Sequence, residues 1–191
     1  LFPDSTLFTG TKATKATLQR VEAPRMLHIA SHGFFLQDAR ETASSNLGVE
    51  NPLLRSGLAL AGANLTNDSH EGILTALEAS GLNLWGTKLV TLSGCDTGVG
   101  EIRNGEGVYG LRRAFVLAGT ESMVMSLWPV SDAIARETMV SYYTGLRAGL
   151  GRGDALREAK LEMLKRRGRE HPFYWASFIQ SGEWANLDGV R

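Results

Sequence analysis

One cysteine and one histidine stand where two apolar runs of the sequence end in turns. Cys95 follows the run Lys88–Ser93 in the turn Gly94–Gly98, and His32 follows the run Met26–Ser31. A thiolate is the strongest nucleophile among ordinary side chains, and an imidazole is its usual proton partner because it titrates near neutral pH. Together they could break an amide bond. Since free cysteine is often only a small buried hydrophobe, the chemistry depends on a fold that brings the two together.

The segments that must position these residues alternate between strand and helix patterns. Strands are expected over Arg25–Ser31, Lys88–Ser93 and Ser122–Trp128, the second apolar on both faces as in a central strand covered by helices. This alternation predicts an α/β fold with a mostly parallel sheet. Ligands bind beyond the carboxyl ends of such strands. If the first two strands are neighbours, about 4.8 Å apart, both side chains can reach one substrate atom.

Capping and turn residues delimit the other elements. Thr75 and Glu78 have the spacing of a capping box, and Ser131 and Asp154 are expected to cap two long helices, which end near Arg147 and Arg167. Further helices are expected over Thr11–Glu22 and Val108–Leu117. A short strand is expected over Gly57–Ala63, and a last strand within the aromatic segment Phe173–Ile179. Polar loops are expected over Gln37–Gly57 and Asn67–Gly72.

Gly33 could add an oxyanion hole to the pair. Its backbone N–H, together with that of Cys95, could stabilise a tetrahedral intermediate, because no side chain stands in the way. Alternatively, Gly33 only permits a tight turn. The other histidines are weaker candidates: His28 lies within a strand, His70 lies in a polar loop, and His171 precedes a proline.

A glycine motif suggests a competing function. The segment Gly105–Gly110 matches G-x-G-x-x-G at the start of a helix, and Asp132 follows at about the distance of a ribose-binding acid. In a dinucleotide-binding unit the first glycine turns directly off the strand, whereas residues 95–104 intervene here. A dinucleotide-binding domain is therefore only a minor alternative.

Length and composition restrict the class of protein. The 191 residues predict a single domain over 1–191, and because the chain starts at Leu1 without a methionine we expect it to be cut from a longer one. Twenty basic residues balance twenty acidic ones, so no basic field attracts nucleic acid, and Lys165–Arg169 is interpreted as a solvated helix end. One cysteine fits a reducing compartment, and the cytoplasm is expected. We expect no membrane span, no metal site and no cofactor.

Several motifs in order resemble the CHAT domain, a family of caspase-like cysteine peptidases related to separases. The resemblance covers nearly the whole chain and rests on five segments: Leu27–Phe35, Leu92–Gly98, Gly105–Leu111, Ser126–Val130 and His171–Ile179. It implies a caspase-like three-layer α/β/α sandwich, with His32 and Cys95 as the catalytic dyad and the N–H groups of Gly33 and Cys95 as oxyanion donors. Gly94 departs from the family, in which alanine is commoner before the cysteine, and we expect this change to be harmless.

The resemblance also implies a reaction and partners. Many CHAT domains follow tetratricopeptide repeats in bacterial proteins, so we expect an endopeptidase that cleaves a specific protein partner through an acyl-enzyme and is regulated by an upstream sensor region. By analogy with caspases, Ser126 and Trp128 would line the cleft, and their strand would pair with an extended peptide. Asp96 and Asp132 could favour a basic P1 residue, although each could equally serve a turn or a helix start. The alternative is a non-catalytic or autoinhibited interaction module of a signalling or defence protein.

Overall fold

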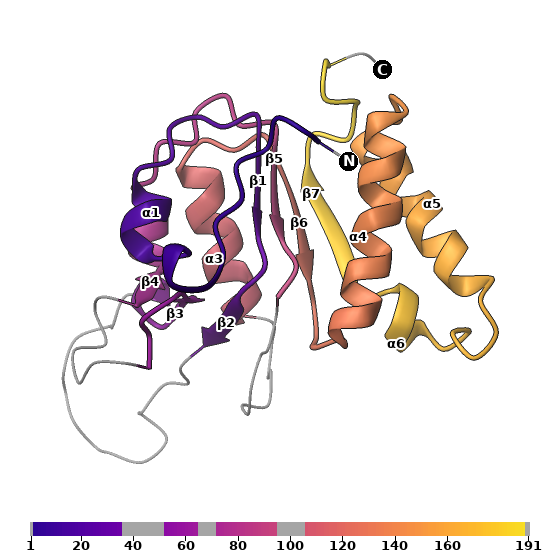
Figure 1. Cartoon of the computed structure of the whole chain (residues 1–191), viewed down its shortest axis with the longest axis horizontal. Coiled ribbons are helices and arrows are strands. Elements are labelled where there is room, and N and C mark those ends of the chain that lie inside the picture. Colours follow the sequence, from indigo (N-terminus) through magenta and orange to yellow (C-terminus); the bar gives the residue numbers. More distant parts are fainter. Residues whose placement is uncertain (1, 36–51, 65–71, 95–105, 190–191) are drawn as a thin grey trace.

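The structure is a computed structural model, which describes residues 2–35, 52–64, 72–94 and 106–189. Its main sheet has four strands, in the spatial order β1-β5-β6-β7 (Figure 1). β5 pairs in parallel with β1 and β6, whereas β7 is antiparallel to β6. The expected mostly parallel sheet is thus confirmed, and the caspase-like three-layer sandwich stays a prediction. The strands are β1 (Met26–Ile29), β5 (Leu89–Leu92), β6 (Ser122–Ser126) and β7 (Phe178–Gly182).

A second, smaller sheet is antiparallel and has the order β2-β3-β4. It consists of β2 (His32–Phe35), β3 (Ser56–Ala59) and β4 (Ile73–Thr75), and β3 accounts for part of the short strand expected over Gly57–Ala63. Only Ala30 and Ser31 separate β1 from β2. Ser31 Oγ donates a hydrogen bond to the carbonyl oxygen of Ala59, which fixes this crossing between the two sheets.

Several helices begin after a residue whose side chain accepts from one of their first backbone N–H groups. They are α1 (Lys15–Gln19), α2 (Ala76–Ala79), α3 (Glu106–Leu117), α4 (Asp132–Arg147), α5 (Arg152–Leu164) and α6 (Pro172–Trp175), with 3-10 turns at Gly10–Lys12 and Pro52–Leu54. The capping box is confirmed, because Thr75 Oγ1 accepts from the Glu78 N–H and the Glu78 carboxylate accepts from the Thr75 N–H at 2.9 Å. Ser131 likewise caps α4.

Three expected elements differ from the structure. Asp154 was expected to cap α5, but Gly151 is the N-cap, because the N–H groups of Arg152 and Gly153 donate to the carbonyls of Ala185 and Trp184. The helix expected over Thr11–Glu22 is reduced to α1, with Thr14 as its cap. The segment expected to contain the last strand forms α6 first, whose first turn starts at Pro172, and β7 begins only at Phe178.

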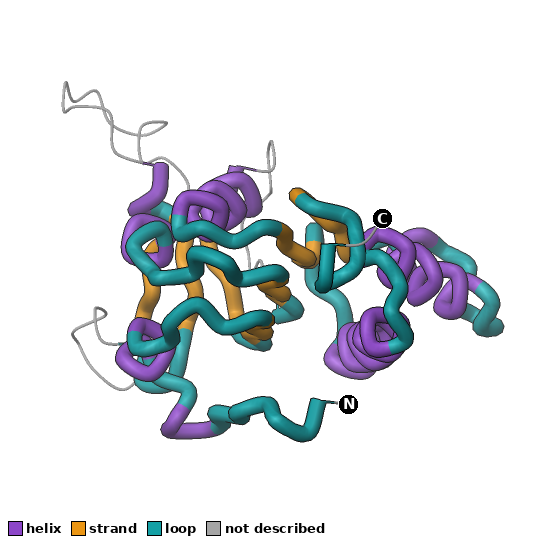
Figure 2. The backbone as a smooth tube through the Cα atoms, turned by 90° about the horizontal axis from the view of Figure 1, so that it is seen from above, coloured by secondary structure: helices purple, strands orange, loops and turns teal. Residues whose placement is uncertain are grey.

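Neighbouring residues of the central strands belong to two different core clusters. Val90 and Met123 pack in one cluster with Phe115 of α3, whereas Leu89 and Val124 pack in the other with residues of α4 and α5. Both faces of β5 are buried, which explains its continuous apolar run. α4 and α5 lie side by side in both views (Figures 1 and 2). Among the described residues, no helix has the length and apolar character needed to cross a membrane.

Candidate active site

The strands that lead to His32 and Cys95 are direct neighbours, which is the condition under which both side chains could reach one substrate atom. β1 and β5 run in parallel with Ile29 opposite Leu92, and the Ser93 N–H donates to the Ile29 carbonyl oxygen at 3.1 Å. One residue further along, the backbones of Gly94 and Ser31 meet: a Cβ placed on Gly94 would lie 2.6 Å from the Ser31 nitrogen. The residue before Cys95 therefore contacts the residue before His32.

This contact gives the glycine at position 94, which departs from the family pattern, a structural role in this chain, and the expectation that the departure is harmless stays a prediction. A Cβ there would also overlap the carbonyl group of Ser31, and real Cβ atoms do not approach backbone atoms so closely. Neither obstacle is the end of a flexible side chain, so the two chain segments would have to move apart. In this chain Gly94 is required for the close approach of the two strand ends.

His32 begins a strand instead of lying in a turn. It is the first residue of β2, where it pairs with Ala59 of β3, and it is exposed. Gly33 follows in the same extended strand, buried opposite Leu58. A Cβ on Gly33 would make ordinary contact with Leu111 at 3.7 Å. The alternative that Gly33 only permits a tight turn is therefore wrong, and its role as an oxyanion donor stays a prediction.

Several sequence-based candidates lie outside the described residues, namely Cys95, Asp96, His70 and Gly105. The surrounding elements nevertheless bear on the dinucleotide alternative. β5 ends at Leu92 and α3 begins only at Glu106. A dinucleotide-binding unit needs a tight turn directly from strand to helix, so this arrangement disfavours it.

Of the expected substrate-binding residues, Ser126, Trp128 and Asp132 are described, and they lie in or after β6. Ser126 is buried, and its hydroxyl donates to the Trp128 carbonyl oxygen at 2.6 Å. The Trp128 indole N–H donates to the Phe173 carbonyl oxygen at 3.0 Å, and Asp132 is exposed in the first turn of α4. β6 is paired with β5 on one side and with β7 on the other. An added peptide strand would therefore have to pair with the chain that follows Ser126.

His28 forms a polar cluster with β5 and α4. Its Nε2 lies 2.6 Å from Ser93 Oγ, and its ring lies 5.5 Å from the ring of Tyr143, whose hydroxyl donates to Thr91 Oγ1 at 3.0 Å. Burial raises the pKa of Tyr143 to about 12, which keeps this donor protonated. Packing of protein atoms around the imidazole lowers the pKa of His28, although the residue keeps an exposed part of its surface.

The His28 cluster ties β1 to β5 just before the two strand ends. In the sequence, His28 is a weaker candidate because it lies within a strand. The signal that could have identified it is the alternation of side chains along a strand. Thr91 and Ser93 are two residues apart and so share one side of the chain, and His28 lies opposite Thr91 in β1. That signal becomes readable only once the pairing register is known.

Within the same described ranges, no group of three or more histidine, cysteine, aspartate or glutamate side chains is placed to hold a metal ion.

Comparison with known proteins assigns the chain to a family. Human tetratricopeptide repeat protein 28 is 33% identical over 118 residues, which are 62% of this chain and 5% of the human protein. The mouse protein of the same name is 32% identical over 118 residues, which are again 62% of this chain and 5% of the mouse protein. The chain thus spans 5% of the length of these curated relatives. The profile of the CHAT domain matches residues 1–183, so the chain belongs to the CHAT domain family, which is caspase-like.

Proposed function

We propose that the chain is a cysteine endopeptidase in which Cys95 is the nucleophile and His32 its proton partner. The observation that carries this proposal is the contact between the Gly94 and Ser31 backbones at the carboxyl ends of β5 and β1. Each of these residues directly precedes one member of the pair. Membership of a caspase-like family supports the same reaction class.

The proposed reaction has two halves. The Cys95 thiolate attacks the carbonyl carbon of the scissile bond, and the backbone N–H groups of Gly33 and Cys95 hold the resulting oxyanion. As the C–N bond breaks, His32 donates a proton to the leaving amine, which leaves an acyl-enzyme. Water then attacks the thioester while His32 accepts its proton. The C–S bond breaks, the carboxylate product leaves and the thiolate is regenerated.

Substrate choice and regulation are further parts of the proposal. The peptide would pair with the chain after Ser126, beside Trp128, and Asp96 or Asp132 would favour a basic P1 side chain. Because the relatives are named as tetratricopeptide repeat proteins, we propose that such a region controls access to the dyad. A reducing compartment such as the cytoplasm suits this chemistry, since the nucleophile must remain a thiol.

The proposal is tested by digestion of a proteome-derived peptide library, with cleavage sites identified by mass spectrometry. The wild-type chain should produce a consistent set of new termini that is lost in both Cys95→Ala and His32→Ala. His171→Ala is the matched control, because His171 only caps α6 by accepting from the Phe173 N–H. Identical termini from wild type and Cys95→Ala would refute the proposal. Absence of cleavage by the wild type would favour the autoinhibited or non-catalytic interaction module.

A further inference from the structure

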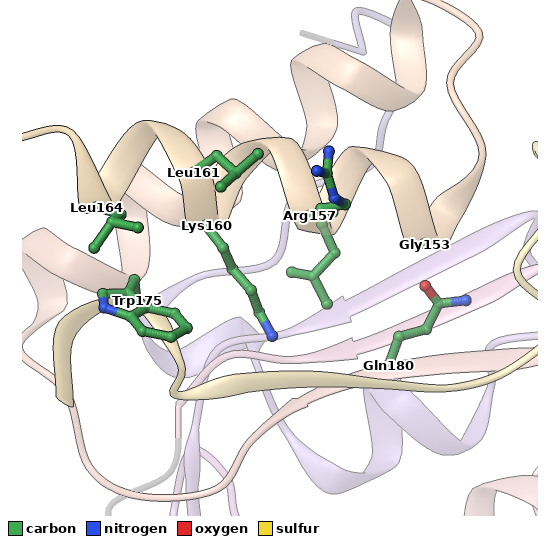
Figure 3. Close-up of a pocket in the computed structure, with 8 residues that line it drawn as sticks. Gly153, Arg157, Lys160, Leu161, Leu164, Trp175 and Gln180 are labelled. Carbon is green, nitrogen blue, oxygen red and sulfur yellow. The ribbon is translucent and has the colours of Figure 1, made fainter. Parts of the chain in front are cut away.

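A groove lies between α5 and β7, lined by residues of α5, by Trp175 of α6 and by Gln180 of β7. Its volume is about 450 Å³, and its apolar wall consists of Leu156, Leu161, Leu164 and Trp175. Figure 3 shows the Lys160 side chain extending from α5 toward β7, with Trp175 and Gln180 to either side of it. β7 is an edge strand of the main sheet, whereas β1, which leads toward His32, is the opposite edge. The groove is therefore separate from the candidate active site.

The backbone of β7 offers hydrogen-bonding groups along this groove. The Leu127 N–H donates to the Ser177 carbonyl at 2.8 Å, and the Glu183 N–H donates to the Glu121 carbonyl at 3.0 Å, so the odd-numbered residues of β7 face β6. In an antiparallel ladder these directions alternate. The N–H and C=O of Gln180 must therefore point outward. An outward-facing strand edge of this kind accepts an added strand.

Two side chains of the groove lack partners that a ligand could supply. The Oε1 atom of Gln180 is buried and accepts no hydrogen bond within the described residues, although Nε2 donates to the Glu183 carbonyl at 2.7 Å. Lys160 is half-buried and forms no ion pair with any residue that the structure describes. Burial lowers the pKa of Lys160 because it disfavours the charged ammonium. A bound anion would offset that cost.

The charge of the groove identifies the kind of occupant. None of the residues that line it is acidic, and Lys160 is the cation that extends toward β7, whereas the guanidinium of Arg157 points away from β7 and pairs with Glu158 at 2.7 Å. A second copy of this chain is a poor occupant, because antiparallel pairing of two β7 strands would bring two cationic grooves together. A carboxylate on an otherwise apolar, extended peptide satisfies the ammonium, the apolar wall and the strand edge at once.

We propose that this groove docks an extended acidic peptide segment of a partner protein, added as a strand to β7. A glutamate or aspartate of the peptide pairs with Lys160. An apolar side chain on the same face of the peptide packs against Trp175 and Leu164, and peptide backbone groups bond the N–H and C=O of Gln180.

The test selects short random peptides, displayed on phage, against the whole 191-residue chain. Enriched sequences are then synthesised with a fluorescein label, and their binding is measured by fluorescence anisotropy. They should alternate apolar residues with at least one acid. Lys160→Glu should weaken binding about tenfold or more, because it places a like charge opposite the peptide carboxylate. Lys160→Gln is a milder second variant, and Lys165→Glu is the charge-matched control at the exposed end of α5.

Two further measurements separate docking on β7 from general attraction of charge. A peptide with lysine in place of its acid should regain affinity for Lys160→Glu. Hydrogen exchange of the Gln180 and Gly182 amides should slow when the original peptide binds. The proposal is overturned if enriched peptides carry no acids, if Lys160→Glu and Lys165→Glu weaken binding equally, or if exchange in β7 does not change. It is also overturned if sedimentation velocity shows a dimer that Lys160→Glu abolishes, since the occupant is then a second copy.

Discussion

At the scale of single residues, Gly94 is the clearest link between the fold and the proposed chemistry. Its contact with Ser31 depends on the absence of a side chain, because a Cβ would lie 2.6 Å from the Ser31 nitrogen. The sequence showed glycine there and gave no sign that the position is crowded. A contact between residues so far apart in the chain depends on the pairing of β1 with β5.

Gly94→Ala should therefore impair both folding and activity. The new methyl group forces the two strand ends apart, at a cost of about 1 to 3 kcal/mol in the free energy of unfolding, and it displaces His32 relative to Cys95. Urea denaturation and the rate of library cleavage measure the two effects. Gly153→Ala is the control, because its Cβ would make only ordinary contacts, the closest at 3.5 Å with Gln180. Unchanged stability and cleavage in Gly94→Ala would contradict this account.

His28 should make the stability of the chain sensitive to acid. Its pKa in the folded state is lowered from 6.5, so below about pH 6.5 the unfolded chain binds a proton more readily than the folded one. Stability should therefore fall as the pH drops from 6.5 toward the folded-state pKa. The effect should be small because His28 is exposed and solvent screens part of the cost of its charge.

The measurement compares urea denaturation of the wild type and of His28→Gln at about pH 7.5 and about pH 5.5. The wild type should lose more stability on acidification than the variant. His171→Gln, at the cap of α6, serves as the control and should behave like the wild type. An equal acid loss in the wild type and His28→Gln would show that His28 does not contribute.

At the scale of elements, Arg152 joins the start of α5 to three other segments. It is 1% exposed, and its guanidinium donates to the carbonyls of Lys88 and Asn186 at 3.0 and 3.1 Å and to Ser122 Oγ at 3.1 Å. Arginine in the first turn of a helix is usually solvated, and nothing in the local sequence marks Arg152 as buried. Its partners belong to the residue just before β5, to β6 and to the C-terminal segment, which the local sequence does not bring together.

Arg152→Met should cost about 3 kcal/mol or more of the free energy of unfolding, because buried carbonyl groups lose their donor. Arg157→Met changes the same residue type on the exposed side of α5, where only a surface pair with Glu158 is lost, and should cost less than about 0.5 kcal/mol. Urea denaturation of the wild type and the two variants measures these losses in the free energy of unfolding. Similar costs would mean that the buried network does not stabilise the fold.

Local signals predicted the elements whose determinants are local. The apolar run of β5, the capping box of Thr75 and the Ser131 cap are confirmed because each depends on residues within a few positions. The prediction that Asp154 caps α5 is wrong because carbonyl groups distant in the sequence accept from the N–H groups of the first turn of this helix. His32 was expected in a turn, but β3, which follows much later in the chain, pairs with it and makes it the start of a strand.

At the scale of the whole molecule, the order of the strands decides which functions are open to the chain. The sequence predicted a mostly parallel sheet and left the order β1-β5-β6-β7 undetermined, because hydrophobic patterns report burial and not neighbours. That order places the ends of β1 and β5 together and leaves β7 at the other edge. β5 ends at Leu92 and α3 begins at Glu106, whereas in a dinucleotide-binding unit the helix follows the strand after a tight turn.

Dinucleotides should therefore leave the folded chain unaffected. Millimolar NAD or FAD is expected to produce no change in Tm, because a ligand that does not bind the native state cannot stabilise it. A thermal melt followed by circular dichroism provides the measurement. A rise in Tm that grows with the dinucleotide concentration would contradict this prediction and restore the minor alternative.

The most direct test of the proposed dyad uses the fact that Cys95 is the only cysteine in the chain. The rate of alkylation by iodoacetamide therefore reports on one sulfur atom and can be followed against pH in the native protein. We predict a thiol pKa below the ordinary value of about 8.5 in the wild type, and its return to that value in His32→Ala, because the imidazolium no longer stabilises the thiolate. Superimposable pH profiles for the two proteins would contradict the pairing of Cys95 with His32.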